Sequence, residues 1–171
     1  MTSILKVDSI QTAAGKPILN SSGSVLQIQS SVSTAASSIT GTSYADIPSM
    51  TATITPSAAS SKILIQVSFG ALGSSGTSHG CFMKLLRGST EIGQGVSGDS
   101  HNLFMNNYLP ATNSYWAVSH MFVDSPNSTS AIVYKMQWAM SGSGETFYMN
   151  RRGIDNYARM SSTFLLTEIA G

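Results

Sequence analysis

An alternation of apolar and polar residues with a period of two is the feature that most constrains how this chain can fold. Within residues 62–69 every second residue is apolar, from Ile63 to Phe69, while the residues between them are mixed. The same period recurs in residues 115–123, 131–140 and 163–169. Because a period of two puts alternate side chains on opposite faces of a strand, these segments predict strands with one face in a core.

Clusters of Gly, Ser, Asn and Pro separate the alternating segments and indicate turns. They lie at residues 70–80, 87–90, 93–98, 124–127 and 141–144. We find no convincing amphipathic helix, and residues 101–109 are expected to form a loop with one turn. Short strands separated by such loops are typical of β-sandwiches. We therefore predict an all-β fold, an antiparallel β-sandwich of jelly-roll type.

The first part of the chain differs from the rest, because its apolar residues come in short clusters separated by Ser, Thr and Gly. Such clusters bury too little apolar area to offset the entropy of ordering the chain. We predict an extended N-terminal arm and linker over residues 1–41 and a β-sandwich knob over residues 42–171. Residues 30–43 are expected to form either a linker or an extended edge strand. The arm residues expected to contact other subunits are Ile4, Leu5, Val7, Ile10, Ile18, Leu19, Val25, Leu26 and Ile28.

Charge is scarce, and this argues against several classes of partner. Only 10% of the residues are charged, whereas the chain contains 31 serines and 15 threonines. Nucleic acid is not expected as a partner, because the largest basic cluster is Arg151-Arg152. No apolar run is long enough for a membrane helix or a signal peptide, so we expect synthesis in a bacterial cytoplasm and no membrane partner. The single cysteine, Cys81, excludes an intramolecular disulfide and is expected to be buried.

The sequence offers little chemistry for catalysis. The three histidines, His79, His101 and His120, are at least 19 residues apart and lack the close spacing typical of metal ligands. The Gly-x-Ser-x-Gly pattern of hydrolases is absent, and most of the acids fall in or beside predicted turns. We predict no catalytic, cofactor-binding or metal-binding residues and no cofactor, with a small hydrolase as a distant alternative. Five aromatics surround the predicted loops, namely Tyr108, Tyr115, Trp116, Tyr148 and Tyr157. The first three are candidate exposed-loop or receptor contacts, although packing in the core or at a subunit interface is the favoured explanation for such residues.

An ordered series of short segments resembles a family of small virion structural proteins of tailed phages. The segments are residues 3–11, 17–27, 47–56, 60–65, 84–93, 124–126, 148–151 and 167–171. In the family, residues 3–27 correspond to a leading arm, 47–65 to a first strand pair and 84–93 to a central hairpin. The resemblance implies a trimeric jelly-roll knob with an N-terminal arm, and it implies no enzyme activity.

Together these observations predict a virion surface protein. The first hypothesis is a capsid decoration, or cement, protein that binds the head as a homotrimer and contacts the major capsid protein or other virion proteins through its arm. The alternative is a tail-fibre or receptor-binding tip that recognises a glycan on the host surface. The chain has no shaft repeat, which favours the first hypothesis.

Overall fold

The computed structural model describes residues 22–95 and 101–171, and these form strands and loops. The eleven strands are β1 (Val25–Ser33), β2 (Ser37–Ile39), β3 (Ala45–Ile54), β4 (Lys62–Ser74), β5 (Cys81–Arg87), β6 (Thr90–Ile92), β7 (Met105–Asn107), β8 (Tyr115–Asp124), β9 (Ile132–Met140), β10 (Phe147–Met149) and β11 (Ser162–Ile169).

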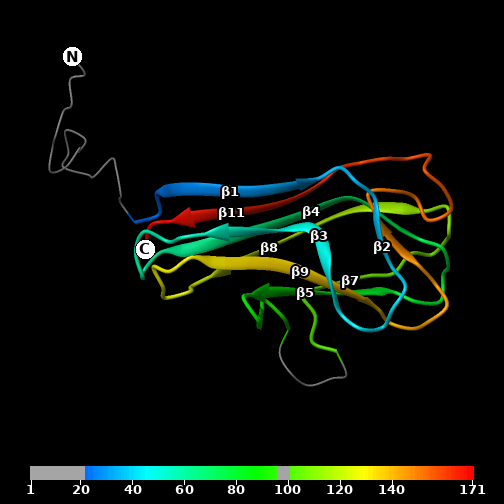
Figure 1. The fold of residues 1–171 in the computed structure, drawn as a ribbon, viewed down its shortest axis with the longest axis horizontal. Coiled ribbons are helices and arrows are strands. Elements are labelled where there is room, and N and C mark those ends of the chain that lie inside the picture. Colours follow the sequence, from blue (N-terminus) through cyan, green and yellow to red (C-terminus); the bar gives the residue numbers. More distant parts are fainter. Residues whose placement is uncertain (1–21, 96–100) are drawn as a thin grey trace, which may run out of the picture.

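The strands form two antiparallel sheets. In the six-stranded sheet, β4 pairs with β8 on one side and with β11 and then β10 on the other. The strands β1 and β2 extend this sheet beyond β11 and β10, respectively. In the five-stranded sheet, β9 lies between β3 and β5, while β6 and β7 pair with the two halves of β5. Figure 1 shows β1, β11 and β4 in one layer and β9 and β5 in the other.

The core lies between the two sheets and is built from the alternation seen in the sequence. The strand β4 contributes Ile63, Ile65, Val67 and Phe69, and all four are buried. From the other sheet, β9 contributes large buried side chains that include Trp138. Removal of this apolar surface from water is the main force that holds the layers together. The predicted all-β class and β-sandwich are confirmed, while the jelly-roll topology stays a prediction.

The sandwich begins earlier in the chain than the sequence indicated. Residues 25–39 were assigned to the arm and linker, but β1 pairs with β11 along its length and β2 pairs with β10. The prediction missed β1 because this strand joins the sheet through backbone hydrogen bonds to β11. These bonds need few buried side chains in β1 itself, so the side-chain pattern did not indicate them. The rest of the arm, residues 1–21, lies outside the described residues.

Two further expectations need correction. The segments predicted as a first strand pair form β3 and β4, which lie in different sheets. Residues 70–80 were predicted as a turn, yet β4 continues to Ser74. The reason is that Gly70 and Gly73 lie beneath the β10–β11 loop, residues 150–161. A Cβ atom at Gly73 would meet the carbonyl oxygen of Arg151 at 2.6 Å.

Two other expectations hold. Residues 84–93 form the β5–β6 hairpin, in which Leu85 pairs with Ile92 and Gly88 has a φ of 61°. Cys81 is fully buried at the start of β5, and burial raises the pKa of its thiol. A thiol with a raised pKa in an apolar site is unreactive, so Cys81 acts as a small core residue.

A buried polar cluster connects the two sheets at the end of β8. Asp124 accepts two hydrogen bonds of 3.0 Å from Arg87 of β5 and one of 2.6 Å from the hydroxyl of Tyr134 of β9. Burial, and then the hydrogen bond to Asp124, raise the pKa of Tyr134, which therefore stays a neutral donor. Since the acceptor and its donors come from opposite sheets, the cluster fixes their relative position.

Candidate interaction surface

The six-stranded sheet has one face in the core and one face outside, and its register arranges the outward residues in three rows across β1, β11, β4 and β8. The first row is Ile28, Thr167, Leu64 and Val123; the second is Ser30, Leu165, Gln66 and Met121; the third is Val32, Thr163, Ser68 and Ser119. We call these twelve residues the uncharged face.

The uncharged face is apolar at half of its positions and carries hydroxyl or amide groups at the other half. Several of its apolar side chains are strongly exposed, namely Met121 at 61%, Val32 at 57%, Ile28 at 56% and Val123 at 49%. Scattered exposed apolar residues are ordinary, but residues gathered on one flat sheet surface are typical of an interaction site.

The outer face of the five-stranded sheet has the opposite character. Asp46 of β3 accepts hydrogen bonds from Lys135 at 2.9 Å and from Gln137 at 2.7 Å, and these two bonds lower the pKa of its carboxyl. On the neighbouring strands Lys84 and Glu91 form an ion pair of 2.5 Å. A surface with paired charges is well suited to water, so the two outer faces of the sandwich differ in what they can contact.

A hollow of about 270 Å³ opens between β4 and β8 beside the uncharged face. Its lining comes mainly from outward residues of these strands, and it comprises Gln66, Val67, Ser68, Ser119, His120 and Met121. Such a hollow can receive a single side chain from a partner, which is the usual form of a strong contact at an interface.

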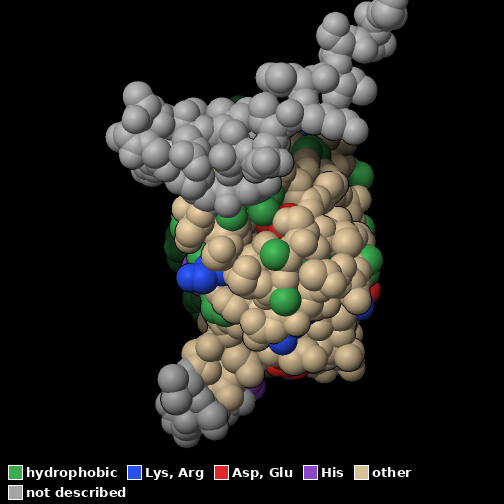
Figure 2. All heavy atoms as spheres, turned by 90° about the vertical axis from the view of Figure 1, so that its left-hand side faces the viewer, with side chains coloured by type: hydrophobic (Ala, Val, Ile, Leu, Met, Phe, Trp, Pro, Cys, Tyr) green, Lys and Arg blue, Asp and Glu red, His purple; other side chains and the backbone are tan. Residues whose placement is uncertain are grey.

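The end of the sandwich at which β1 begins and β11 ends is also poor in charge. Figure 2 looks onto this end, and its described surface consists mostly of backbone and uncharged polar groups with scattered hydrophobic side chains. A pocket of about 480 Å³ lies here between Leu26, the 57–61 loop and the C-terminal residues. Leu26, one of the predicted arm contacts, is half-buried at its edge.

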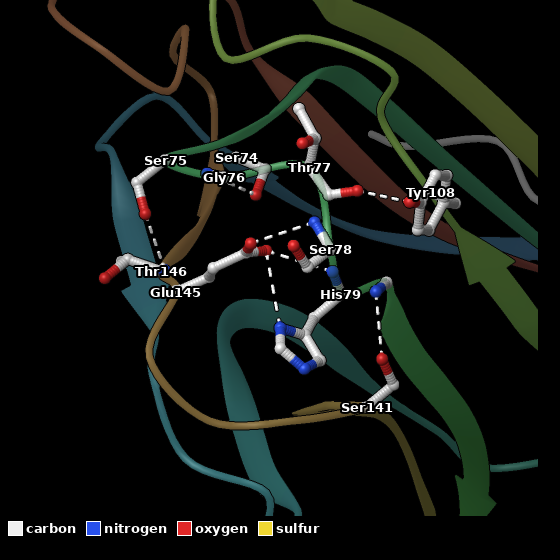
Figure 3. A network of polar contacts seen from close by, with 11 residues as sticks. Ser74, Ser75, Gly76, Thr77, Ser78, His79, Tyr108, Ser141, Glu145 and Thr146 are labelled. Carbon is white, nitrogen blue, oxygen red and sulfur yellow. Dashed lines mark hydrogen bonds and ion pairs between the residues drawn. The ribbon is translucent and has the colours of Figure 1, made fainter.

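At the opposite end, one carboxylate joins two loops. Glu145, between β9 and β10, accepts hydrogen bonds from the backbone amides of Ser78 at 2.9 Å and His79 at 3.1 Å (Figure 3). Burial alone would raise the pKa of Glu145, but these amide bonds lower it. The imidazole Nδ1 of His79 lies 3.7 Å from Glu145 Oε2, within ion-pair distance once the ring is protonated. This geometry ties the β4–β5 loop to the β9–β10 loop.

The predicted receptor contacts lie at this same end of the molecule. The hydroxyl of Tyr108 donates a hydrogen bond to the carbonyl oxygen of Thr77, and its side chain is exposed (Figure 3). Tyr115 and Trp116 begin β8, where they pair with Gly73 and Leu72 near the end of β4. Tyr115 is half-buried, whereas Trp116 is 47% exposed.

The β10–β11 loop adds two arginines, which the sequence did not single out, to the aromatics Tyr148 and Tyr157, which it placed beside loops. The guanidinium of Arg152 lies 4.8 Å from the ring of the exposed Tyr157 and pairs with Asp155, and it interacts electrostatically with Tyr115. Arg151 lies 4.2 Å from the ring of Tyr148. Only the dense aromatic and arginine content of residues 148–159 hinted at this arrangement.

The predicted arm contacts divide into two groups. Ile4, Leu5, Val7, Ile10, Ile18 and Leu19 lie outside the described residues. Val25, Leu26 and Ile28 belong to β1, and Val25 and Ile28 are exposed. Ile28 is thus the one predicted contact that falls on the uncharged face. Leu64, Met121 and Leu165 were not predicted as contacts, although alternation had already put each of them opposite the clearest core residues.

The histidines lie apart from one another. The ring of His101 lies 4.5 Å from that of Phe82, and the ring of His120 lies 4.7 Å from that of Phe104. Among residues 22–95 and 101–171, no group of three His, Cys, Asp or Glu side chains is arranged to hold a metal ion. The same residues include no helix with the length and apolarity needed to cross a membrane.

Comparison with known proteins adds no relative to these observations. No protein-family model matches the chain. A search of curated proteins likewise finds no significant match.

Proposed function

We propose that this chain is a non-enzymatic structural subunit that assembles with copies of itself on the surface of a phage particle. In its most concrete form, it is a capsid decoration protein that binds the head as a homotrimer. The proposal joins the resemblance to small virion proteins with the β-sandwich fold.

The uncharged face carries the assembly part of the proposal. Its twelve residues include the exposed Ile28, Val32 and Met121 and none that is charged, so this part of the sheet is costly to leave in water and favourable to cover. Capsid-bound subunits work in contact with one another, so they need such a surface on the side that meets a neighbour.

The buried acids support the structural part. Asp124, Glu145 and Glu168 each accept several hydrogen bonds from groups that belong to other strands or loops. Carboxylates used in this way hold the fold together. Contact with the major capsid protein through residues 1–21 remains part of the proposal, and strand addition is the mode that such a segment suits.

A second function is favoured by the loop end that carries Tyr108, Trp116 and Tyr157. Exposed aromatic rings beside an arginine–carboxylate pair, Arg152 with Asp155, are groups that stack on and hydrogen-bond to sugars. A tail-fibre or receptor-binding tip that recognises a host glycan would use this end.

Copy number and location on purified virions distinguish the two functions. We expect gold-labelled antibody against the chain to mark the head, and quantitative mass spectrometry to find hundreds of copies per particle. Labelling confined to the tail, with tens of copies, would replace decoration by the receptor-binding function. Absence of the chain from virions would overturn both.

A further inference from the structure

We infer that the uncharged face is the surface through which one copy of this chain packs against a second copy. The inference rests on the proposed function, since it names the surface that a self-assembling subunit uses. It concerns β1, β11, β4 and β8 and leaves the aromatic loop end free.

The first argument is the contrast between the two outer faces. Both sheets have an outer face. That of the five-stranded sheet carries Asp46, Lys84, Glu91 and Lys135, whereas the strands of the uncharged face present one outward charge beside its rows, that of Lys62 at the start of β4. None of the twelve residues of the uncharged face is charged. Such a difference in charge is expected of a subunit that keeps one outer face in water and packs the other against a neighbouring subunit.

The second argument concerns which partner fits. A surface without charge has no charge pattern that a foreign partner could complement, and specificity for a foreign protein usually uses such a pattern. In the proposed homotrimer, the uncharged faces of neighbouring copies would meet around the threefold axis without any unpaired charge, since every residue of the face is apolar or can hydrogen-bond as donor and acceptor. The face is therefore self-compatible.

The third argument is area. Three rows about 6.8 Å apart on four strands spaced about 4.8 Å apart cover roughly 400 Å². Two copies would bury about 800 Å² in total, so the interface must also cover apolar neighbours such as the exposed Val25 to reach the roughly 1,000 Å² of specific interfaces. The hollow beside Met121 provides a place where a side chain of the second copy can anchor.

The test is the mass of the full chain in solution, measured by analytical ultracentrifugation from 1 to 100 µM. Met121→Lys places a charge at the most exposed apolar position of the uncharged face. The matched control is Val133→Lys, at a position 44% exposed on the outer face of the other sheet. We expect the wild type and the control to be oligomers of equal mass. For Met121→Lys we expect a dissociation constant raised about 100-fold or more, because an unpaired charge would be buried.

A second variant and a salt series keep the test decisive. Ile28→Lys, at the other edge of the sheet, should give the same result if Met121→Lys fails to fold by circular dichroism. Wild-type association should be unchanged between 0.05 and 1 M NaCl, because no charges meet. An oligomer that both variants leave intact would overturn the inference and leave the proposed function standing. A wild type that stays monomeric at 100 µM would also overturn it, and virion labelling would still decide the function.

Discussion

At the scale of single residues, Glu168 shows how this chain holds a negative charge inside the protein without a cation. Its side chain is fully buried at the end of β11. Its carboxylate accepts hydrogen bonds from the amide and hydroxyl of Ser57, from the hydroxyl of Ser61 and from Gln27. Burial would raise the pKa of Glu168, but the bonds from Ser57, Gln27 and Ser61 lower it to about 2.

We predict that Glu168→Gln destabilises the fold at pH 7 by about 2–3 kcal/mol, because hydrogen bonds to a charge are lost and amide hydrogens then face other donors. The folded pKa lies below the ordinary value of 4.5. The charge therefore stabilises the fold fully above pH 4.5, and this contribution disappears as the pH falls toward 2. Urea unfolding of both proteins between pH 7 and pH 2.5 measures the difference.

The control for this prediction is Glu91→Gln, which removes a carboxylate from an exposed pair with Lys84. We expect it to cost less than about 1 kcal/mol at pH 7. If the deficit of Glu168→Gln stayed constant from pH 7 to pH 2.5, the buried charge would not be its cause.

The sequence predicted the side of the strand on which Glu168 lies, but not its hydrogen-bond donors. Alternation put Glu168 on the same side of its strand as Phe164 and Leu166, and all three are buried. Its hydrogen-bond donors lie more than 100 residues away along the chain, at Gln27, Ser57 and Ser61. No local pattern identifies such partners, because three-dimensional proximity here follows from the pairing of β11 with β1, which brings in Gln27, and with β4, which brings in Ser61.

At the scale of strands and loops, the close contact between β4 and the β10–β11 loop is the most demanding feature. The backbone of Arg151 and Gly153 lies directly over Gly73. Buried Asn150 anchors the start of this loop, donating to the carbonyl oxygens of Ser33 and Ala35 at 2.8 and 2.9 Å.

We predict that Gly73→Ala displaces this loop, because the added methyl group would lie 2.6 Å from two backbone atoms. A loss of about 2–3 kcal/mol is expected, as for overpacking, with faster amide exchange in residues 150–161. The control is Gly41→Ala, whose nearest neighbour would be an ordinary 3.9 Å away. Equal unfolding free energies for the two variants would contradict the close packing.

Period-two alternation predicted the long strands β4, β8, β9 and β11, since each has many residues and one clear core face. The strands β2, β6, β7 and β10 have three residues each, too few for a period to be recognised. β1 was assigned to the arm because the apolar residues of this region come in short clusters separated by Ser, Thr and Gly; in the structure Val25, Ile28 and Val32 are indeed exposed. Its place in the sheet depends on hydrogen bonds to β11, which sequence patterns do not report.

At the scale of the whole molecule, the proposed packing of the uncharged face against a second copy would link stability to concentration. Each copy gains the interface only while folded, so mass action favours the folded state as concentration rises.

We predict that the Tm of the wild type rises by a few degrees between 2 and 200 µM, because a chain of this size shifts by about 2–4 °C per kcal/mol. The Tm of Met121→Lys, which places a charge on the uncharged face, should stay constant over that range. The Tm of Val133→Lys, which places the same charge on the outer face of the other sheet, should rise as that of the wild type does. Differential scanning calorimetry measures all three. A wild-type Tm independent of concentration would contradict self-association.

The chemistry of the uncharged face was visible in the sequence, but its extent was not. Leu64, Met121 and Leu165 each stood on the mixed side of an alternating segment. Only the registers of β4 with β8 and with β11 put Gln66 between Leu165 and Met121 in one row. Register depends on long-range pairing, so a single strand pattern cannot supply it.

The pairing of β1 with β11 also gives the molecule a polarity along its length. Gly23 donates to the carbonyl oxygen of Ala170 and Ala170 donates to that of Ser24, so the chain enters and leaves the sandwich at one end (Figure 1). The loop with Glu145 lies at the other end. A cargo fused after Gly171 would therefore lie at the end where β1 begins. A peptide inserted between Ser141 and Gly144 would project from the opposite end, which makes that loop the better site for displaying a foreign sequence.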